Sequence, residues 1–225
     1  LGLHLGTPVS QDADGTLLGH VRDERITRTG PEVRLYRTRE RQDFHTDGAD
    51  IIGLLCLHEA LAGGESKLAS SHAVHNEILR RRPDLLDVLY EPMWWDRNGG
   101  ESPGEDPAFA LPILSDVNGT PRFFYIGWYI RDAQRHPQVP RLTPAQAEAL
   151  DLIETIANDP TFHVEMAFQP GDVQLLNNAV ILHSREAYQD HDDPTRRRHL
   201  LRLWLSAHHF TSVDDTLRGG IPQRS

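Results

Sequence analysis

A histidine and an aspartate stand two residues apart in His45-Thr46-Asp47, just before the apolar run 51–57. Residues two apart in an extended segment project from the same face, so both side chains can bind one metal ion. The spacing recurs in His191-Asp192-Asp193 and, with glutamate, in His75-Asn76-Glu77. The first of these lies in a charged loop, and the second lies in a predicted helix, where positions two apart diverge. We therefore expect the metal site at His45 and Asp47.

A third metal ligand is expected at His183, which follows the apolar run 173–182. Two histidines and one carboxylate form the facial triad of non-haem Fe(II) oxygenases, which leaves open positions for a co-substrate and oxygen. The same three side chains can bind zinc, so a zinc enzyme remains open at this point.

Two arginines lie on one face of the last predicted strand, 198–207. Arg198 follows His183 by 15 residues, and Arg202 comes four residues later. A guanidinium in apolar surroundings needs an anion, which is either a carboxylate of a bound molecule or an internal Asp or Glu. We expect Arg198, rather than Arg196 or Arg197, to bind a co-substrate because it is in phase with Arg202. For Arg202, a substrate anion and an internal ion pair explain the position equally well.

The elements around these residues are mostly strands. Turn residues and period-two patterns predict strands over 42–48, 51–57, 123–130, 162–168, 173–182 and 198–207, and one that contains Trp94-Trp95. Asn118-Gly119 predicts a hairpin. Two helices are expected, one over 72–82 with Ser71 as its cap and Pro83 at its end, and one over 144–158 after Thr143.

Many strands and only two helices predict a mainly β fold with flanking helices, namely a double-stranded β-helix (a cupin-like jelly roll). In the last strand, the face that carries Leu201, Leu203 and Leu205 is expected to be the buried one. Residues 98–107 are rich in Gly, Pro and acids and are expected to form a surface loop, with a lid as the alternative. We expect one catalytic domain over residues 1–225, and the start at Leu1 leaves a missing N-terminal segment open.

Composition narrows the function class. The 225 residues carry 23 Lys and Arg against 33 Asp and Glu, a net charge of −10, which disfavours nucleic-acid and anionic membrane partners. No apolar stretch is long enough to cross a bilayer. The single cysteine, Cys56, lies in an apolar run, so we expect it in the core of a cytoplasmic protein. The partner expected is a small-molecule substrate, and homo-oligomerisation stays open.

Four blocks of sequence resemble the TauD/TfdA-like family of Fe(II)- and 2-oxoglutarate-dependent dioxygenases. They occur in the family's order, over about residues 43–205, and are Phe44-His45-Thr46-Asp47, Gly63-Gly64-Glu65-Ser66, Asn177-Asn178 through His183, and Arg198-His199-Leu200-Leu201-Arg202. The resemblance implies that His45, Asp47 and His183 bind Fe(II), and that Arg198 with Ser66 holds the distal carboxylate of 2-oxoglutarate. It also implies that Arg202 matches a position at which some relatives bind an anionic group of the substrate.

The activity that this resemblance implies is oxidation of an unactivated C–H bond by O2 and 2-oxoglutarate, with release of succinate and CO2. Because Asp47 supplies a carboxylate where halogenating relatives have a small residue, the resemblance implies an oxygenase outcome. We expect hydroxylation, with desaturation or ring closure as alternatives. The substrate is expected to be small and amino-acid-like, or a carboxylate or sulfonate, with Trp128 and Tyr125 as further contacts. The alternatives are a cupin-like zinc or manganese enzyme that does not use 2-oxoglutarate, and a catalytically silent β-domain that binds a small molecule.

Overall fold

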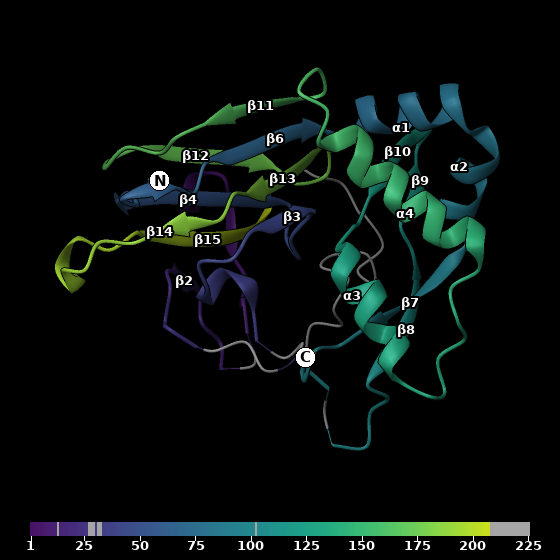
Figure 1. The fold of residues 1–225 in the computed structure, drawn as a ribbon, viewed down its shortest axis with the longest axis horizontal. Coiled ribbons are helices and arrows are strands. Elements are labelled where there is room, and N and C mark those ends of the chain that lie inside the picture. Colours follow the sequence, from purple (N-terminus) through teal and green to yellow (C-terminus); the bar gives the residue numbers. More distant parts are fainter. Residues whose placement is uncertain (13, 27–29, 31–32, 102, 208–225) are drawn as a thin grey trace.

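The computed structural model describes residues 1–12, 14–26, 30, 33–101 and 103–207. Two antiparallel sheets stack at one end of the molecule, and α1, α2 and α4 lie together at the other (Figure 1). The helices are α1 (Ser71–Arg81), α2 (Pro83–Leu89), α3 (Gly127–Asp132) and α4 (Pro144–Ala157), with short 3-10 turns η1 (Gly2–His4), η2 (Leu35–Arg37), η3 (Ala133–Arg135) and η4 (Pro194–Arg196). No helix among the described residues is long and apolar enough to span a membrane.

The first sheet has five strands in the order β1-β15-β4-β12, with β2 also paired to β15. Its strands are β1 (Gly6–Pro8), β2 (Leu18–Val21), β4 (Ile51–His58), β12 (Val173–Asn177) and β15 (His199–Ala207). β4 lies inside this sheet, between β15 on one side and β12 on the other. Its apolar run suits such a position, because both of its edges are paired. Cys56 of β4 is a buried free thiol, as predicted.

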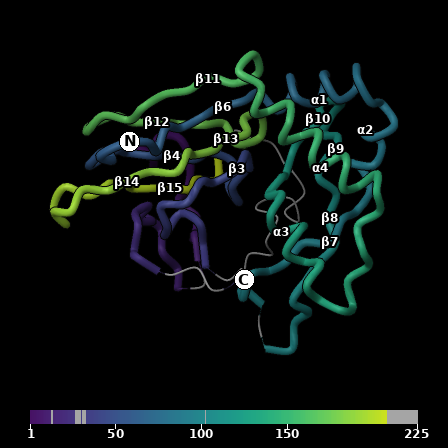
Figure 2. The backbone as a smooth tube through the Cα atoms, in the orientation of Figure 1, coloured from purple at the N-terminus to yellow at the C-terminus, as the bar shows by residue number. Residues whose placement is uncertain are grey.

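The second sheet has four strands in the order β11-β6-β13-β3. Its strands are β3 (Gln42–His45), β6 (Ser66–Ser70), β11 (His163–Met166) and β13 (Ile181–Arg185). The backbone trace shows β3 and β13 side by side although they lie far apart in the chain (Figure 2). One cavity is lined by residues of both sheets, so the two sheets face each other, and the predicted mainly β jelly roll with flanking helices is confirmed.

The helices and two hairpins cover one end of the jelly roll, whereas β5 (Ala62–Gly63) pairs with β14 (Tyr188–Gln189), a strand distant in the chain that lies with the sheets (Figure 1). The hairpin strands at the helical end are β7 (Pro92–Asp96) with β8 (Ala108–Pro112), and β9 (Leu114–Val117) with β10 (Thr120–Phe123). The largest apolar cluster lies here and joins Phe44 of β3 to α1, α2, α4 and Trp95. The predicted helices are confirmed over α1 and α4, except that Ser70, one residue before Ser71, caps α1.

Two helices were not expected. Pro83 ends α1 as predicted, but it also occupies the first position of α2, where proline fits a helix start. The predicted strand over 123–130 was wrong beyond Phe123, because residues 127–132 form α3. The Asn118-Gly119 hairpin itself is confirmed, since both residues have positive φ. Residues 123–130 form a nearly continuous apolar, aromatic run, and such a run predicts a buried strand and a buried helix equally well.

The single strand expected over 173–182 is two strands. A turn at residues 178–180 separates β12 from β13, and the two belong to different sheets. The expectation for the buried face of β15 holds only at Leu205, which is fully buried. Leu201 and Leu203 are half-buried, whereas Leu200, Arg202 and Trp204 on the other face are buried. The buried face points into the cavity between the sheets, where charged side chains are required.

Candidate active site

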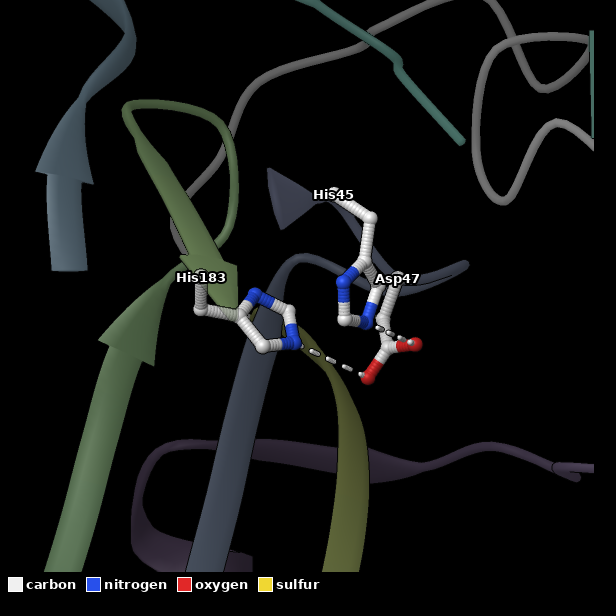
Figure 3. A group of neighbouring side chains, drawn as sticks. All are labelled: His45, Asp47 and His183. Carbon is white, nitrogen blue, oxygen red and sulfur yellow. Dashed lines mark ion pairs between the residues drawn. The ribbon is translucent and has the colours of Figure 1, made fainter. Parts of the chain in front are cut away.

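The structure brings His45, Asp47 and His183 together. Their ligand atoms all lie within 4.8 Å of one another, and the side chains point toward a common centre (Figure 3). His183 of β13 is the direct cross-strand partner of His45 of β3, so sheet pairing places the two rings 4.2 Å apart. Asp47 follows β3 and reaches back, with its carboxylate oxygens 4.0 Å from His45 Nε2 and 3.7 Å from His183 Nε2.

The loop that carries Asp47 is held from two sides. The Asn178 side chain accepts from the Asp47 amide at 2.9 Å and donates to the Asp47 carbonyl at 2.6 Å and the Ala49 carbonyl at 2.7 Å. On the other side, the Thr46 amide donates to the Tyr125 carbonyl, and the Tyr125 amide donates to the Thr46 hydroxyl. These bonds fix the direction of Asp47 before any ligand binds.

The hydrogen bonds of His45 fix its tautomer. Its Nδ1 lies 2.8 Å from the Asp43 carbonyl, which can only accept, so Nδ1 carries the proton. Nε2 then carries a free lone pair on the side of Asp47, and it accepts a hydrogen bond from the Gln42 side chain at 3.2 Å. Burial and the neighbouring His183 lower the pKa of His45 to about 3, so its ring is neutral at physiological pH, as a metal ligand requires.

Asp47 is ionised despite its burial. Burial favours the neutral carboxyl, but the charge of Arg202 and the hydrogen bond and charge of His183 outweigh it, so the pKa of Asp47 lies well below its usual range. Arg202 Nη1 is 3.5 Å from Asp47 Oδ2, and the Trp204 indole N–H donates to the same oxygen at 3.1 Å. Two imidazoles and one carboxylate, each with an outer hydrogen-bond partner or a fixed strand position, fit a divalent first-row metal ion.

An inner pocket extends from the triad between the two sheets, with about 480 Å³ of empty space that includes the opening to solvent. Ser66 and Arg198, which were expected to act together, both line it and are 5% and 4% exposed. Gly64, with φ of +81°, permits the close approach, because a Cβ there would lie 3.1 Å from Arg198 Nε. Arg198 Nη1 is buried without a hydrogen-bond partner, so the pocket presents an unused donor to a bound anion.

Arg185 is a residue that the sequence analysis missed. It lies in the same inner pocket, 6% exposed, and its Nε and Nη1 have no partner. Burial and the charge of Arg198 lower the pKa of Arg185 to about 10, and both guanidiniums lie about 5 Å from the centre of the Tyr188 ring. No carboxylate forms an ion pair with Arg185 or Arg198 in the part of the chain that the structure describes. The signal was available, because Arg185 follows His183 by two positions in a strand.

The three consecutive arginines 196–198 lie in different surroundings. Arg196 is exposed, and Arg197 donates to the carbonyls of His191 and Asp192 within its own loop. Arg198 alone of the three lines the inner pocket. The choice of Arg198 from its phase with Arg202 therefore agrees with the geometry.

An outer cavity reaches the triad from the opposite side, with about 1330 Å³ of empty space that includes the opening to solvent. Arg202 and Trp128 line it as expected, and the Trp128 ring lies edge-on to His45 at 5.1 Å. Tyr125 does not line it: the side chain is 1% exposed in the helical core, and its hydroxyl donates to Glu154 at 2.9 Å. The assignment of Tyr125 to substrate binding was thus wrong. The start of the predicted loop, 98–100, does line this cavity.

Comparison with known sequences identifies relatives over most of the chain. The family described as "Taurine catabolism dioxygenase TauD, TfdA family" matches residues 2–204. The chain is 38% identical over 215 residues to FR-33289 synthase of Streptomyces rubellomurinus, a match that covers 92% of this chain and 62% of that protein. It is 38% identical over 185 residues to a taurine hydroxylase-like protein of Stachybotrys chartarum, covering 80% of this chain and 44% of that protein. The chain thus spans less than two thirds of either relative.

Comparison with solved structures supports the fold. Asparagine oxygenase in complex with Fe(II), 3-hydroxyasparagine and succinate superposes with a TM-score of 0.66 at 19% identity, over 89% of this chain and 61% of that one. At this level of identity the likeness concerns the arrangement of the sheets and helices.

Proposed function

The chain belongs to the TauD/TfdA family of dioxygenases, and from this premise we propose that it is a non-haem Fe(II)- and 2-oxoglutarate-dependent dioxygenase that hydroxylates a small molecule. Iron with 2-oxoglutarate and O2, when bound, supplies the oxidising power that places oxygen on an unactivated C–H bond, with release of succinate and CO2. The triad of His45, Asp47 and His183 would hold the iron.

One observation carries this proposal: the inner pocket that opens from the triad contains the buried guanidiniums of Arg198 and Arg185 with unused N–H donors. A small molecule that binds the metal ion and carries a distal carboxylate would supply the acceptors that these donors lack. Its far end would pair with Arg198 and Ser66 while its near end reaches the triad. Arg185 would add a second donor. Holding 2-oxoglutarate at both ends leaves its reacting carbons fixed relative to the metal, which is the positioning that the reaction requires.

For the prime substrate we propose a small, amino-acid-like molecule or a carboxylate or sulfonate that enters through the outer cavity. Arg202 and Trp128 line that cavity beside the triad, so an anionic group and an apolar stem can both be accommodated. One relative is named a taurine hydroxylase-like protein, and taurine is an amino-sulfonate, which agrees with this class. We further propose a reducing, cytoplasmic location, in keeping with the free Cys56.

The test is succinate formation from 2-oxoglutarate with Fe(II), ascorbate and O2, screened against amino acids, sulfonates and small carboxylic acids. Stimulation by one class, with equimolar hydroxylated product, is the expected result. Activity that needs Zn(II) or Mn(II) and no 2-oxoglutarate would instead identify the cupin-like alternative. Ligand binding without turnover under any of these conditions would identify a silent binding domain.

A further inference from the structure

The outer cavity contains a cation that the proposed function does not use. Arg34 precedes η2, lines the cavity and is half-buried, and its guanidinium lies 5.4 Å from the centre of the Tyr129 ring. No described carboxylate forms an ion pair with it, whereas its neighbour Arg37 pairs with Glu24 at 2.6 Å. The Asp96 carboxylate acts on Arg34 from a distance but is itself paired with Arg135 and His136. An arginine held in a cavity by an aromatic face, without an ion pair of its own among the described residues, is available to a ligand.

Arg202 is the second cation of this cavity. Its Nε donates to Gln11 at 2.8 Å, and its guanidinium lies 4.6 Å from the Tyr36 ring and 4.8 Å from the Trp204 ring. Its nearest carboxylate is Asp47, which the proposed function assigns to the metal ion. Burial lowers the pKa of Arg34, and the charge of Arg202 acts in the same direction, so the two positive charges are close enough to repel.

We propose that Arg34 and Arg202 together bind a doubly charged tetrahedral anion of the prime substrate, a phosphonate or a phosphate monoester group. This rests on the proposed function and narrows its substrate class. A carboxylate offers two oxygens and one charge, which satisfy a single guanidinium fork. A PO3 group offers three oxygens and up to two charges, so it can pair with both guanidiniums and remove their repulsion.

The cavity walls strengthen this preference. Trp128 and Tyr129 of α3 line the cavity together with Tyr36, so the two guanidiniums lie among rings rather than in open solvent. Charge pairing is stronger in such surroundings than at a water-exposed surface, and the second charge of the ligand is therefore worth more there. A sulfonate has the same three-oxygen shape with one charge, which makes it the matched probe for charge alone.

The experiment is calorimetric titration of the full chain at pH 8 with ethylphosphonate, methyl phosphate, ethanesulfonate and propionate, with and without Fe(II) and 2-oxoglutarate under argon. We expect one or both phosphorus anions to bind at least about tenfold more tightly than ethanesulfonate. Binding of ethylphosphonate alone indicates a phosphonate substrate, and binding of methyl phosphate alone indicates a phosphate ester. Equal affinity for ethanesulfonate and both phosphorus anions, or no binding of either phosphorus anion, overturns the proposal.

Variants locate the effect. Arg34→Gln is expected to remove the tenfold preference for the phosphorus anion over ethanesulfonate, and Arg34→Lys is expected to restore part of it. Arg22→Gln is the control, because Arg22 is an exposed arginine that does not line the outer cavity. A preference that survives in Arg34→Gln, with its melting temperature unchanged, contradicts the assignment. The anion preference is measured without metal, so it is tested separately from the proposed function. If adding Fe(II) and 2-oxoglutarate to the wild-type chain changes nothing in these titrations, that result counts against the proposed function.

Discussion

The inner pocket and the outer cavity meet at His45 and Asp47, which line both, but the two are built differently. Strand residues supply Ser66, Arg185 and Leu200 to the inner pocket, and Arg198, which immediately precedes β15, completes it. The outer cavity is walled by segments between strands, including 33–37 and 98–100, and by α3. A rigid wall suits a co-substrate that is the same throughout a family, and loops suit a substrate that differs between members.

Their cations differ in the same way. The inner guanidiniums are buried with unused donors, so an anion there replaces missing hydrogen bonds and is expected to bind with little adjustment. The outer guanidiniums lie against rings, and Arg202 also pairs with Gln11 and Asp47. An anion in the outer cavity must compete with some of these contacts, so affinity on that side depends more on the charge of the ligand.

The largest effect is expected where the two regions meet. Asp47→Ala removes the only carboxylate of the triad and is expected to lower Fe(II) affinity by roughly 100-fold or more and abolish succinate formation. Asp193→Ala is the control, since it lies in the second His-x-Asp pattern and its carboxylate only accepts from Thr195. Full activity in Asp47→Ala would contradict the metal assignment.

The next effect separates the two cavities. Arg198→Gln is expected to raise the KM for 2-oxoglutarate by about 100-fold, because it removes a buried charge partner, while the prime-substrate KM changes far less. Arg196→Gln, two residues away and exposed, is expected to leave both values unchanged. Equal changes in both KM values for Arg198→Gln would show that the two cavities are not distinct.

A smaller effect is expected at Trp204, whose N–H donates to Asp47. Trp204→Phe keeps the aromatic packing and removes this donor, so Fe(II) affinity should fall about tenfold and the visible band of the Fe(II)–2-oxoglutarate complex should shift. Trp94→Phe, on β7 away from the triad, serves as the control. An unchanged Fe(II) dissociation constant and band position in Trp204→Phe would exclude this role for the hydrogen bond.

The smallest effect concerns stability and not catalysis, and it is expected in the helical core behind the triad. Burial raises the pKa of Glu154 to about 7, so the folded state holds a proton that the unfolded chain releases near pH 4.5. This contribution to the free energy of unfolding is complete below pH 4.5 and is lost as the pH rises to about 7. Urea unfolding should show a loss of about 1–3 kcal/mol between pH 5 and pH 8 that Glu154→Gln abolishes. The same pH dependence in both proteins would contradict the shift.

Sequence patterns predicted the parts of the molecule that depend on short-range spacing. His45 and Asp47 were predicted to act together because they are neighbours in the chain, and the structure brings them together with His183. Arg198 was chosen because strand periodicity relates it to Arg202, and it lines the inner pocket. The jelly roll followed from turn residues and alternating strands. Each of these signals is complete within about ten residues, or within one element.

The errors arose where tertiary context decides. The apolar run after Phe123 is typical of a buried strand, yet residues 127–132 form α3, which packs against β7. Tyr125 lies in the core, where its hydroxyl donates to Glu154. The face of β15 that carries Leu200 and Arg202 is buried because it faces the cavity between the sheets, which no local pattern records. Arg34 comes from a loop whose approach to Arg202 depends on the whole fold, so its spacing carried no signal.

The most direct test of the central claim is an anaerobic titration of the wild-type chain with Fe(II) and 2-oxoglutarate, followed by visible absorption. A weak band is expected only when both are present, and Arg198→Gln should require about 100-fold more 2-oxoglutarate to reach it. Iron bound to the folded chain with no band at saturating 2-oxoglutarate would contradict the claim that the triad and the inner pocket form one Fe(II)- and 2-oxoglutarate-binding site.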